Sequence, residues 1–260
     1  MICSPNCLGV NWFYEKNTPT LILVTSIDIT FNVYSDTPSG KDPDTYSPTL
    51  RSYHKFLWSK PLPNKIIFAL NDKTPKLLHH KSDLGEFFLS SDAFGHTYGA
   101  GPNEYMSMSK IVDKAPPLVK KRFFEVCCTI GAFIIFPSKR IDGRQTINMA
   151  RGTNHKIKDR FDLTLECIRR YYKNEDSPLS ETLTRYSKFF NLFESFQGYV
   201  DFFLLQDLVT ENYAEVKFWL PFNSFDNSPL PTSVDEYIFY SKNVTDLILA
   251  RNQRMNNFIP

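Results

Sequence analysis

The chain has 260 residues, of which 42 per cent are hydrophobic and 15 per cent aromatic, and its formal net charge at pH 7 is +2. Disordered chains combine few large hydrophobic residues with a high net charge, so this composition excludes that class. At roughly 100 to 200 residues per domain, we expect one folded domain over residues 26–260. Residues 1–25 mix Pro, Asn and Gly without sustained periodicity and predict a poorly organised extension.

The cysteine content and the apolar runs bear on the compartment. Five cysteines are an odd number in a chain too large to depend on disulfides, which favours free thiols in a reducing environment. Residues 1–25 lack the basic stretch and apolar core of a secretory signal. The longest apolar run, 126–136, is about half the roughly 20 residues that a membrane-spanning helix needs. We therefore expect a cytoplasmic protein without a membrane segment.

The first part of the chain predicts one helix followed by strands. Ser47 suits a helix cap and Pro48 the first helical position, so we expect an amphipathic helix over 48–58. Strands are expected where short apolar runs are separated by Asn, Asp and Gly, at 65–70, 77–80 and 86–90. The glycine-rich segment 94–102 predicts a loop, and 103–124 predicts two helical pieces.

The centre of the chain carries the clearest hairpin signal. The apolar run 126–136 is typical of a buried strand, Asp142–Gly143 is a turn dipeptide, and 145–149 resembles a returning strand. After it, apolar side chains recur every three or four residues and predict helices over 157–172, 178–198, 199–209 and 233–257. The sequence therefore predicts an α+β fold with a central antiparallel sheet and a mostly helical C-terminal half.

The near-neutral total charge hides a strong asymmetry. Residues 105–174 carry 15 basic and 6 acidic groups, whereas residues 175–260 carry 6 basic and 12 acidic groups. A basic segment of this kind is suited to tracking the phosphates of a nucleic acid. The alternative is that the acidic C-terminal helices pack against the basic segment and neutralise it.

The densest polar cluster lies within residues 139–170 and suggests chemistry on RNA. Asn154 suits a helix cap, which would place His155 in the first turn, where the helix dipole lowers a histidine pKa. A neutral His155 beside Arg151 and Arg160 could act as general base on a ribose hydroxyl while the arginines stabilise the developing charge. These three are the predicted catalytic residues. The predicted phosphate contacts are Lys139, Arg140, Arg144, Lys156 and Lys158. The alternative is a structural role, in which His155 and Arg151 tie a turn to the sheet.

Four further residues are second-tier candidates. His79 and His80 are neighbours in a predicted strand and therefore point to opposite faces, so they cannot share one ligand. Asp159 and Glu166 would share a face of the 157–172 helix, where ion pairs with nearby arginines are the alternative to a functional role. No motif for a metal or an organic cofactor is present, and we expect neither.

Several runs resemble a bacterial family that is known only as a domain of unknown function. They are KDPDTYSPTLRSYH (41–54), LWSKPLPN (57–64), GEFFLSSD (85–92), INMARGTNHKIKDRFDLTLECIRRYY (147–172) and FQGYVDFFLLQDLV (196–209). The resemblance extends from about residue 27 to the C-terminus. It implies a single domain and a bacterial cytoplasmic protein, and it implies no reaction or ligand.

Three functional hypotheses follow from the residues. The leading one is RNA binding, or metal-independent nuclease activity of a toxin or defence type, through the basic 139–170 segment. The second is a non-catalytic protein that binds a partner or a second copy of itself through the aromatic helices at 178–209. The third is a small-molecule enzyme with a pocket between the sheet and the helices.

Overall fold

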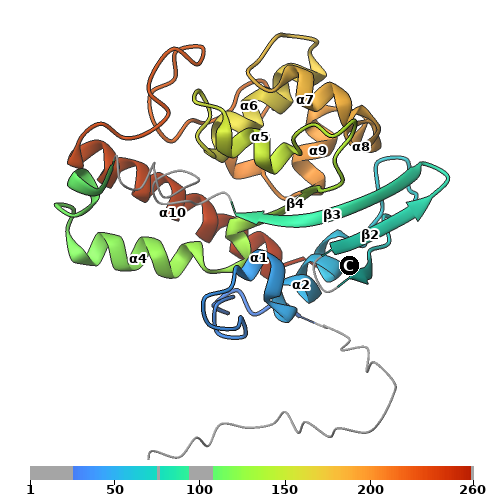
Figure 1. The fold of residues 1–260 in the computed structure, drawn as a ribbon, viewed down its shortest axis with the longest axis horizontal. Coiled ribbons are helices and arrows are strands. Elements are labelled where there is room, and N and C mark those ends of the chain that lie inside the picture. The colour runs from blue at the N-terminus through green and yellow to red at the C-terminus, as the bar shows by residue number, and fades with distance from the viewer. Residues whose placement is uncertain (1–25, 75–76, 94–107, 259–260) are drawn as a thin grey trace, which may run out of the picture.

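The computed structural model describes residues 26–74, 77–93 and 108–258, and Figure 1 shows their arrangement. The predicted extension at 1–25, the predicted loop at 94–102 and the start of the 103–124 helical segment lie outside the described residues. Strands lie in the first half of the fold and helices dominate the second, which confirms the α+β class.

Two helices open the described part of the chain, α1 (Pro43–Tyr46) and α2 (Pro48–Trp58). The predicted helix start is confirmed, because the Ser47 hydroxyl accepts a 3.1 Å hydrogen bond from the Leu50 amide. One face of α2 is buried, and it carries Leu50, Tyr53, His54, Leu57 and Trp58. That face turns toward the sheet and brings a histidine into the interior.

The sheet has four antiparallel strands in the order β1 (Asn71–Thr74), β2 (Leu77–Ser82), β3 (Gly85–Ala93) and β4 (Phe133–Pro137). The predicted strands at 77–80 and 86–90 are confirmed as parts of β2 and β3. The predicted strand at 65–70 is wrong, because that segment contributes only an isolated bridge between Ile67 and Pro61. β4 is buried at all five positions, since both of its faces are covered.

The predicted hairpin around Asp142–Gly143 is also wrong. Helix α4 (Pro117–Cys127) takes the beginning of the apolar run, a turn of 3-10 helix η1 (Ile130–Ala132) follows, and β4 pairs with β3. Asp142 and Gly143 do form a turn, with φ values of 52° and 71°. The chain after the turn forms helix α5 (Ile147–Thr153), because the Thr146 hydroxyl caps it by accepting from the Met149 amide at 3.3 Å.

The helix that the sequence predicts over 233–257 is confirmed, whereas the other helices of the C-terminal half are shorter than predicted. In chain order this half contains α6 (Phe161–Tyr172), α7 (Ser180–Arg185), α8 (Ser187–Phe190), η2 (Asn191–Phe193), α9 (Phe196–Phe202), η3 (Gln206–Leu208) and the confirmed helix α10 (Val234–Asn256). Glu194 and Leu204 adopt left-handed φ values of 62° and 55°, and these residues end the helical runs that precede them. Gly198 lies inside α9 and does not end a helix; a Cβ there would lie 2.1 Å from the Phe193 carbonyl oxygen.

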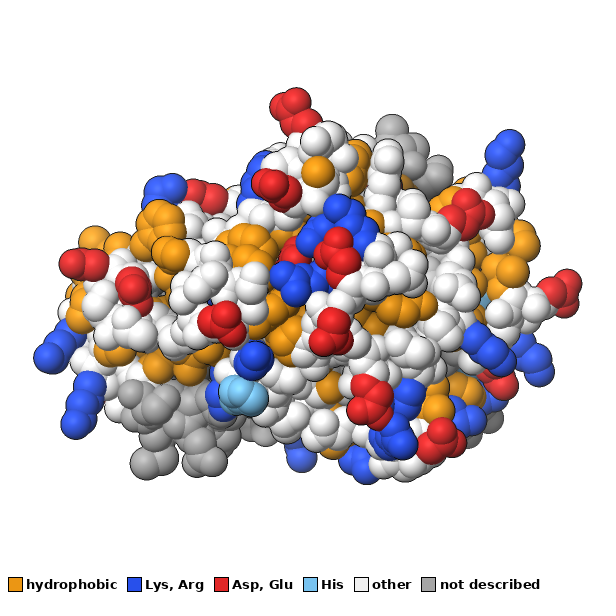
Figure 2. Space-filling model, turned by 90° about the horizontal axis from the view of Figure 1, so that it is seen from above, with side chains coloured by type: hydrophobic (Ala, Val, Ile, Leu, Met, Phe, Trp, Pro, Cys, Tyr) orange, Lys and Arg blue, Asp and Glu red, His pale blue; other side chains and the backbone are white. Residues whose placement is uncertain are grey.

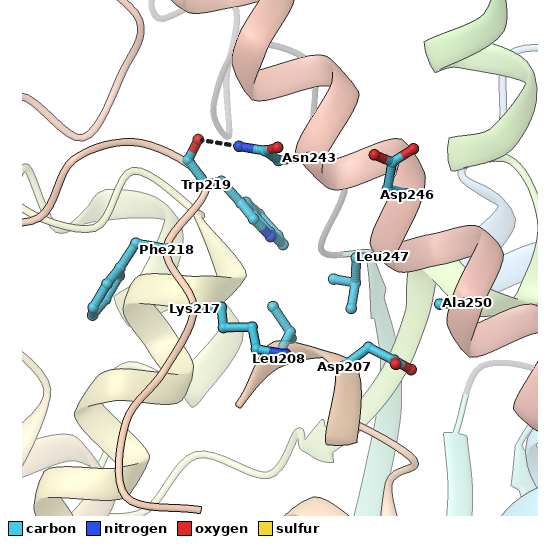
Figure 3. Close-up of a pocket in the computed structure, with 9 residues that line it drawn as sticks. All are labelled: Asp207, Leu208, Lys217, Phe218, Trp219, Asn243, Asp246, Leu247 and Ala250. Carbon is cyan, nitrogen blue, oxygen red and sulfur yellow. Dashed lines mark hydrogen bonds between the residues drawn. The ribbon is translucent and has the colours of Figure 1, made fainter. Parts of the chain in front are cut away.

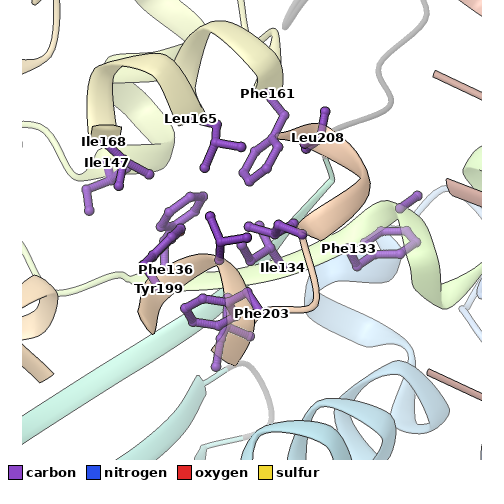
Figure 4. Close-up of a cluster of buried hydrophobic side chains, with 14 of the residues drawn as sticks. Phe133, Ile134, Phe136, Ile147, Phe161, Leu165, Ile168, Tyr199, Phe203 and Leu208 are labelled. Atoms are coloured by element: carbon purple, nitrogen blue, oxygen red, sulfur yellow. The ribbon is translucent and has the colours of Figure 1, made fainter. Parts of the chain in front are cut away.

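The core forms where α6 and α9 pack against β4, with α10 running beside α4 (Figure 1). Figure 4 shows Ile134 and Phe136 of β4 against Phe161 of α6, Tyr199 of α9 and Phe203, the residue that follows α9. The aromatic side chains at 178–209 thus face the interior of their own chain. The predicted use of these rings as a partner surface would require them to leave this core.

A buried arginine ties α10 to the sheet. Arg251 donates through Nη1 to the carbonyl oxygens of Gly131 and Phe133 at 2.8 and 2.7 Å, and through Nε and Nη2 to that of Phe203 at 3.2 and 3.0 Å.

Within the described part of the chain, none of the helices is both long and apolar enough to cross a membrane.

Candidate functional site

Arg151, the first predicted catalytic residue, lies in the interior, with a side chain that is 0 per cent exposed. Its guanidinium group pairs with Asp92 near the end of β3, and its Nη2 donates to the Asp159 carbonyl oxygen at 3.0 Å. Its Nε donates to Thr164 Oγ1 on α6 at 2.9 Å. Arg151 therefore joins β3, α5 and α6, and its donors are directed at protein groups.

Asp44, Asp92 and Asp159 lie close to Arg151 and form a cluster with it. Their negative charges contribute to raising the pKa values of Asp44 and Asp92. Burial raises the pKa of Asp44 in α1 to about 7, and the negative charge of Asp42 adds to the effect. Burial also raises the pKa of Asp92; Arg151 opposes this, while Asp159 and Asp44 reinforce it. Among the described residues, Oδ1 of Asp44 is buried without a hydrogen-bond partner. One arginine among three carboxyl groups leaves excess negative charge, so this cluster favours a bound proton near neutral pH.

His54 and Ser91 lie beside this cluster and have the spacing of a base and its nucleophile, with Nε2 and Oγ 2.9 Å apart. The Trp58 indole, which can only donate, donates to His54 Nδ1 at 3.0 Å. Nδ1 is therefore the acceptor, and Nε2 carries the hydrogen that faces Ser91. Burial lowers the pKa of His54 to about 3, with a further contribution from the charge of Arg251. The imidazole is neutral and cannot remove the Ser91 proton in this arrangement.

His155 does not occupy the first turn of a helix, which corrects the prediction based on the helix dipole. Asn154 is the C-cap of α5, and α6 begins only at Phe161. The intervening loop contains Lys158 and Asp159 in left-handed conformations, with φ values of 46° and 64°. His155 is exposed on this loop, whereas Arg151 is buried beneath it. The structure therefore does not bring the two together on one open surface.

Arg160, the third predicted catalytic residue, is also buried and bonded. Its Nε donates to Asp162 Oδ1 at 3.0 Å, its Nη2 pairs with Asp162 Oδ2, and its Nη1 donates to the Pro229 carbonyl oxygen at 3.0 Å. Asp162 accepts in addition from the Trp219 amide at 2.9 Å. Arg160 thus fixes the long segment before α10 to the start of α6.

The second-tier acidic residues are held by arginines. Glu166 accepts from Arg169 Nε at 2.7 Å and from Arg170 Nε at 2.8 Å, and its own side chain is 4 per cent exposed. Asp159 lies 3.4 Å from Arg151 Nη2. Among the described residues, no group of three His, Cys, Asp or Glu side chains is arranged to hold a metal ion. Asp159 and Glu166 therefore both lie in ion pairs with arginines, which is the alternative to a functional role.

The two histidines of β2 point to opposite faces, as the strand pattern predicts. His80 is buried; its Nδ1 lies 2.9 Å from the Ala69 carbonyl oxygen, and burial lowers its pKa. His79 lies on the outer face, where its Nε2 is 2.8 Å from Glu86 Oε1 and its ring is 4.9 Å from that of Phe88. Only His79 is therefore placed to contact a ligand on the outside of the sheet.

The predicted phosphate contacts lie in three different settings. Lys139 and Arg140 are exposed beyond the end of β4, and Lys139 Nζ lies 5.6 Å from the centroid of Phe88. Arg144 is exposed but pairs with Glu181 of α7. Lys156 and Lys158 are partly buried on the loop around Arg151. We use the term basic aromatic face for His79, Lys81, Phe88, Lys139 and Arg140.

Acidic residues from the C-terminal segment neutralise part of the basic segment. Glu181 pairs with Arg144, and Glu175 lies 3.3 Å from Arg169. Figure 2 shows basic and acidic side chains intermixed on the side of the molecule seen from above. Lys139 and Arg140 lie outside these ion pairs and are exposed, so they are the part of the 139–170 segment best suited to a polyanion.

One cavity of about 310 Å³ lies between η3, α10 and residues 217–219 (Figure 3). The Trp219 ring points into it, and Asn243 Nδ2 donates to the Trp219 carbonyl oxygen at 3.0 Å. Asp207 and Asp246 lie at its edge. The residues that line it include none of the predicted site residues.

The groups described above do not form a recognised catalytic motif. A family of unknown function, DUF6994, matches residues 27–255. The chain belongs to the DUF6994 family. No curated protein and no solved structure matches it. The DUF6994 match begins at residue 27, after the residues that the sequence predicts to form an extension.

The cluster around Arg151 contains residues that the sequence did not single out. Asp44 and Asp92 appear in the sequence as a turn residue and a strand end, and neither has a neighbour in sequence that reveals its burial. Both do fall within the runs KDPDTYSPTLRSYH and GEFFLSSD that carry the resemblance to a family. Their position within these runs is the one feature of the sequence that points to Asp44 and Asp92, and the fold of this DUF6994 protein brings them together.

Proposed function

We propose that the protein binds single-stranded RNA through the basic aromatic face, with bases stacked at Phe88 and phosphates held by Lys139 and Arg140. The observation that supports it best is the position of Lys139 Nζ, 5.6 Å from the centroid of a half-buried ring on the outer side of the sheet. An aromatic ring next to exposed basic side chains is the arrangement that single-strand binding proteins use.

The neighbours of Phe88 favour a stacked base. His79 is its register partner on β2, and the two ring centroids are 4.9 Å apart. Lys81 lies two residues further along β2 and is exposed on the same side. Base stacking on an aromatic side chain contributes about 1–3 kcal/mol per base and tolerates any sequence. We therefore expect weak sequence preference and strong salt dependence.

Binding is proposed in preference to cleavage because of where the predicted catalytic side chains lie. The guanidinium groups of Arg151 and Arg160 are buried and donate to Asp92, Asp162 and backbone carbonyl oxygens. A nuclease reaction at His155 would have to proceed without either of them in this conformation. The proposed activity therefore depends on the sheet surface and leaves Arg151 a structural role.

The test is the binding of a fluorescent 12-nucleotide oligouridine to the full-length protein, followed by anisotropy between 25 and 200 mM salt. Each phosphate contact that is removed should lower the slope of log affinity against log salt by about 0.7. The variant Lys139→Gln/Arg140→Gln should therefore lose about 1.4 in slope. Phe88→Leu should weaken binding about 5-fold or more at all salt concentrations.

The matched control is Lys121→Gln on α4, which removes an exposed charge far from the basic aromatic face. It should retain the affinity and the slope of the parent protein. Failure of the parent to bind at 25 mM salt would remove the proposal. If Lys121→Gln loses as much affinity as the variants of the basic aromatic face, the attraction of RNA is non-specific and this face is not the binding site.

A further inference from the structure

Lys60 follows the end of α2 and lies among three aromatic rings. Its Nζ is 5.3 Å from the centroid of Trp58 and 4.9 Å from those of both Phe202 and Phe258. The faces of the rings attract a cation and hold the side chain in one place. The rings also displace water, which removes solvation from the ammonium group.

The same side chain lines a pocket of about 460 Å³ on the outside of the molecule. That volume lies within the roughly 300–1,000 Å³ that is usual for small-molecule sites. Its lining includes an apolar set, residues 61–63 together with Phe202. It also includes a polar set, which consists of Ser195, Gln197, Gly198 and Asp201. The pocket therefore combines a lysine with both apolar and polar groups.

Burial and the charge of Arg251 oppose protonation of Lys60, whereas the charge of Asp201 favours it. The Arg251 guanidinium carbon lies 5.6 Å from the centroid of Trp58, so two cations share one ring. Burial lowers the pKa of Lys60 to about 7, the charge of Arg251 adds to this, and Asp201 acts in the opposite direction. Asp201 Oδ1 is already engaged, since it accepts from Gln206 and Tyr213 at 2.9 and 2.8 Å. An ordinary lysine, with a pKa near 10.4, is neutral in only about one molecule in 2,500 at pH 7.

We propose that Lys60 is a nucleophilic amine that captures a small aldehyde in this pocket as an imine. The lone pair of the neutral Nζ forms a bond to the carbonyl carbon, and the carbonyl π electrons move to the oxygen, which takes up a proton. The resulting carbinolamine loses a proton from nitrogen and its hydroxyl group as water. The products are one C=N bond and one water molecule, no atom is oxidised or reduced, and hydrolysis reverses the step.

The test uses propanal as the probe and cyanoborohydride to reduce any imine to a stable propyl amine. The full-length protein is treated briefly at pH 7, digested, and each lysine is quantified by mass spectrometry. Lys60 should gain the propyl group at least about 10-fold faster than Lys121 and Lys242, whose side chains are 71 and 69 per cent exposed. Its labelling rate should rise with pH to a midpoint near 7 and then level off.

Two variants separate reactivity from packing. Lys60→Arg keeps a cation among the rings and should give no adduct at this position. Asp201→Asn removes the carboxylate that favours the ammonium form, so the midpoint of Lys60 labelling should move to lower pH. Labelling of Lys60 that is equal to or slower than that of Lys121 would overturn the proposal, because a lysine that is merely buried is protected from reagents.

Discussion

Arg151 and Asp92 form an ion pair between α5 and β3, and the side chains are 0 and 14 per cent exposed. The two residues are 59 positions apart in sequence, and Asp159 and Thr164 hold the other guanidinium donors. A buried pair of this kind contributes little relative to apolar residues of the same shape, but removal of one partner leaves an uncompensated charge. The consequences for stability can be measured.

Arg151→Met should lower the free energy of unfolding by about 3–5 kcal/mol, because Asp92 and Asp159 lose the cation between them. Urea denaturation checks this. Arg144→Met is the matched control, since Arg144 is 58 per cent exposed and its pair with Glu181 should contribute less than about 1 kcal/mol. Adding Asp92→Asn to Arg151→Met should restore part of the loss; no recovery would mean that the charge of Asp92 is not what destabilises the single variant.

Asp44→Asn should change how stability depends on pH. The folded pKa of Asp44 is about 7, above the roughly 3.9 of an unfolded aspartate, so the folded state binds the proton more tightly. Asp44 therefore contributes stability below pH 4 that is lost as the pH rises through 7. The variant should be more stable than the parent by at least about 1 kcal/mol at pH 8 and should lose that advantage at pH 4. An unchanged difference between the two pH values would contradict this.

His54→Gln should produce the opposite trend. The folded pKa of His54 is about 3, below the roughly 6.5 of an unfolded histidine, so the unfolded state binds the proton more tightly. Its contribution is present above pH 6.5 and is lost as the pH falls toward 3. Asp44 and His54 act in opposite directions between pH 4 and 6.5, so their contributions to the stability of the parent should offset each other there. Thermal melts should show Asp44→Asn gaining stability with rising pH in this window and His54→Gln losing it.

Gly131→Ala should destabilise the fold by about 3 kcal/mol, because an added Cβ would lie 2.5 Å from Asn252 Oδ1 and 2.6 Å from the Ile248 carbonyl oxygen. Gly143→Ala is the control. A Cβ at that position meets nothing within 4 Å, and only its φ of 71° opposes the substitution, at about 1–2 kcal/mol. Chemical denaturation of the two variants should therefore rank them clearly, and equal losses would show that α10 shifts to accommodate the methyl group.

Much of the fold was predictable because its signals are local. The helix at 48–58 and the strands at 77–80 and 86–90 follow from caps and short apolar runs, which depend on neighbours in sequence. The hairpin at 126–149 was mispredicted because the partner of a buried strand is a long-range choice. Phe133–Pro137 pairs with β3, and the cap at Thr146 starts a helix where the sequence predicted a returning strand.

The candidate site residues show the same difference between what local sequence predicts and what long-range contacts decide. The sequence by itself determined that the chain folds, that it is α+β, and that its basic residues are concentrated between residues 105 and 174. Only the tertiary structure decided which of those charges meet solvent. It buried Arg151 and Arg160 against carboxylates and left Lys139 exposed beside Phe88. Whether a basic side chain is available to a ligand depends on partners such as Asp92, which lie far away in sequence and contribute no local pattern.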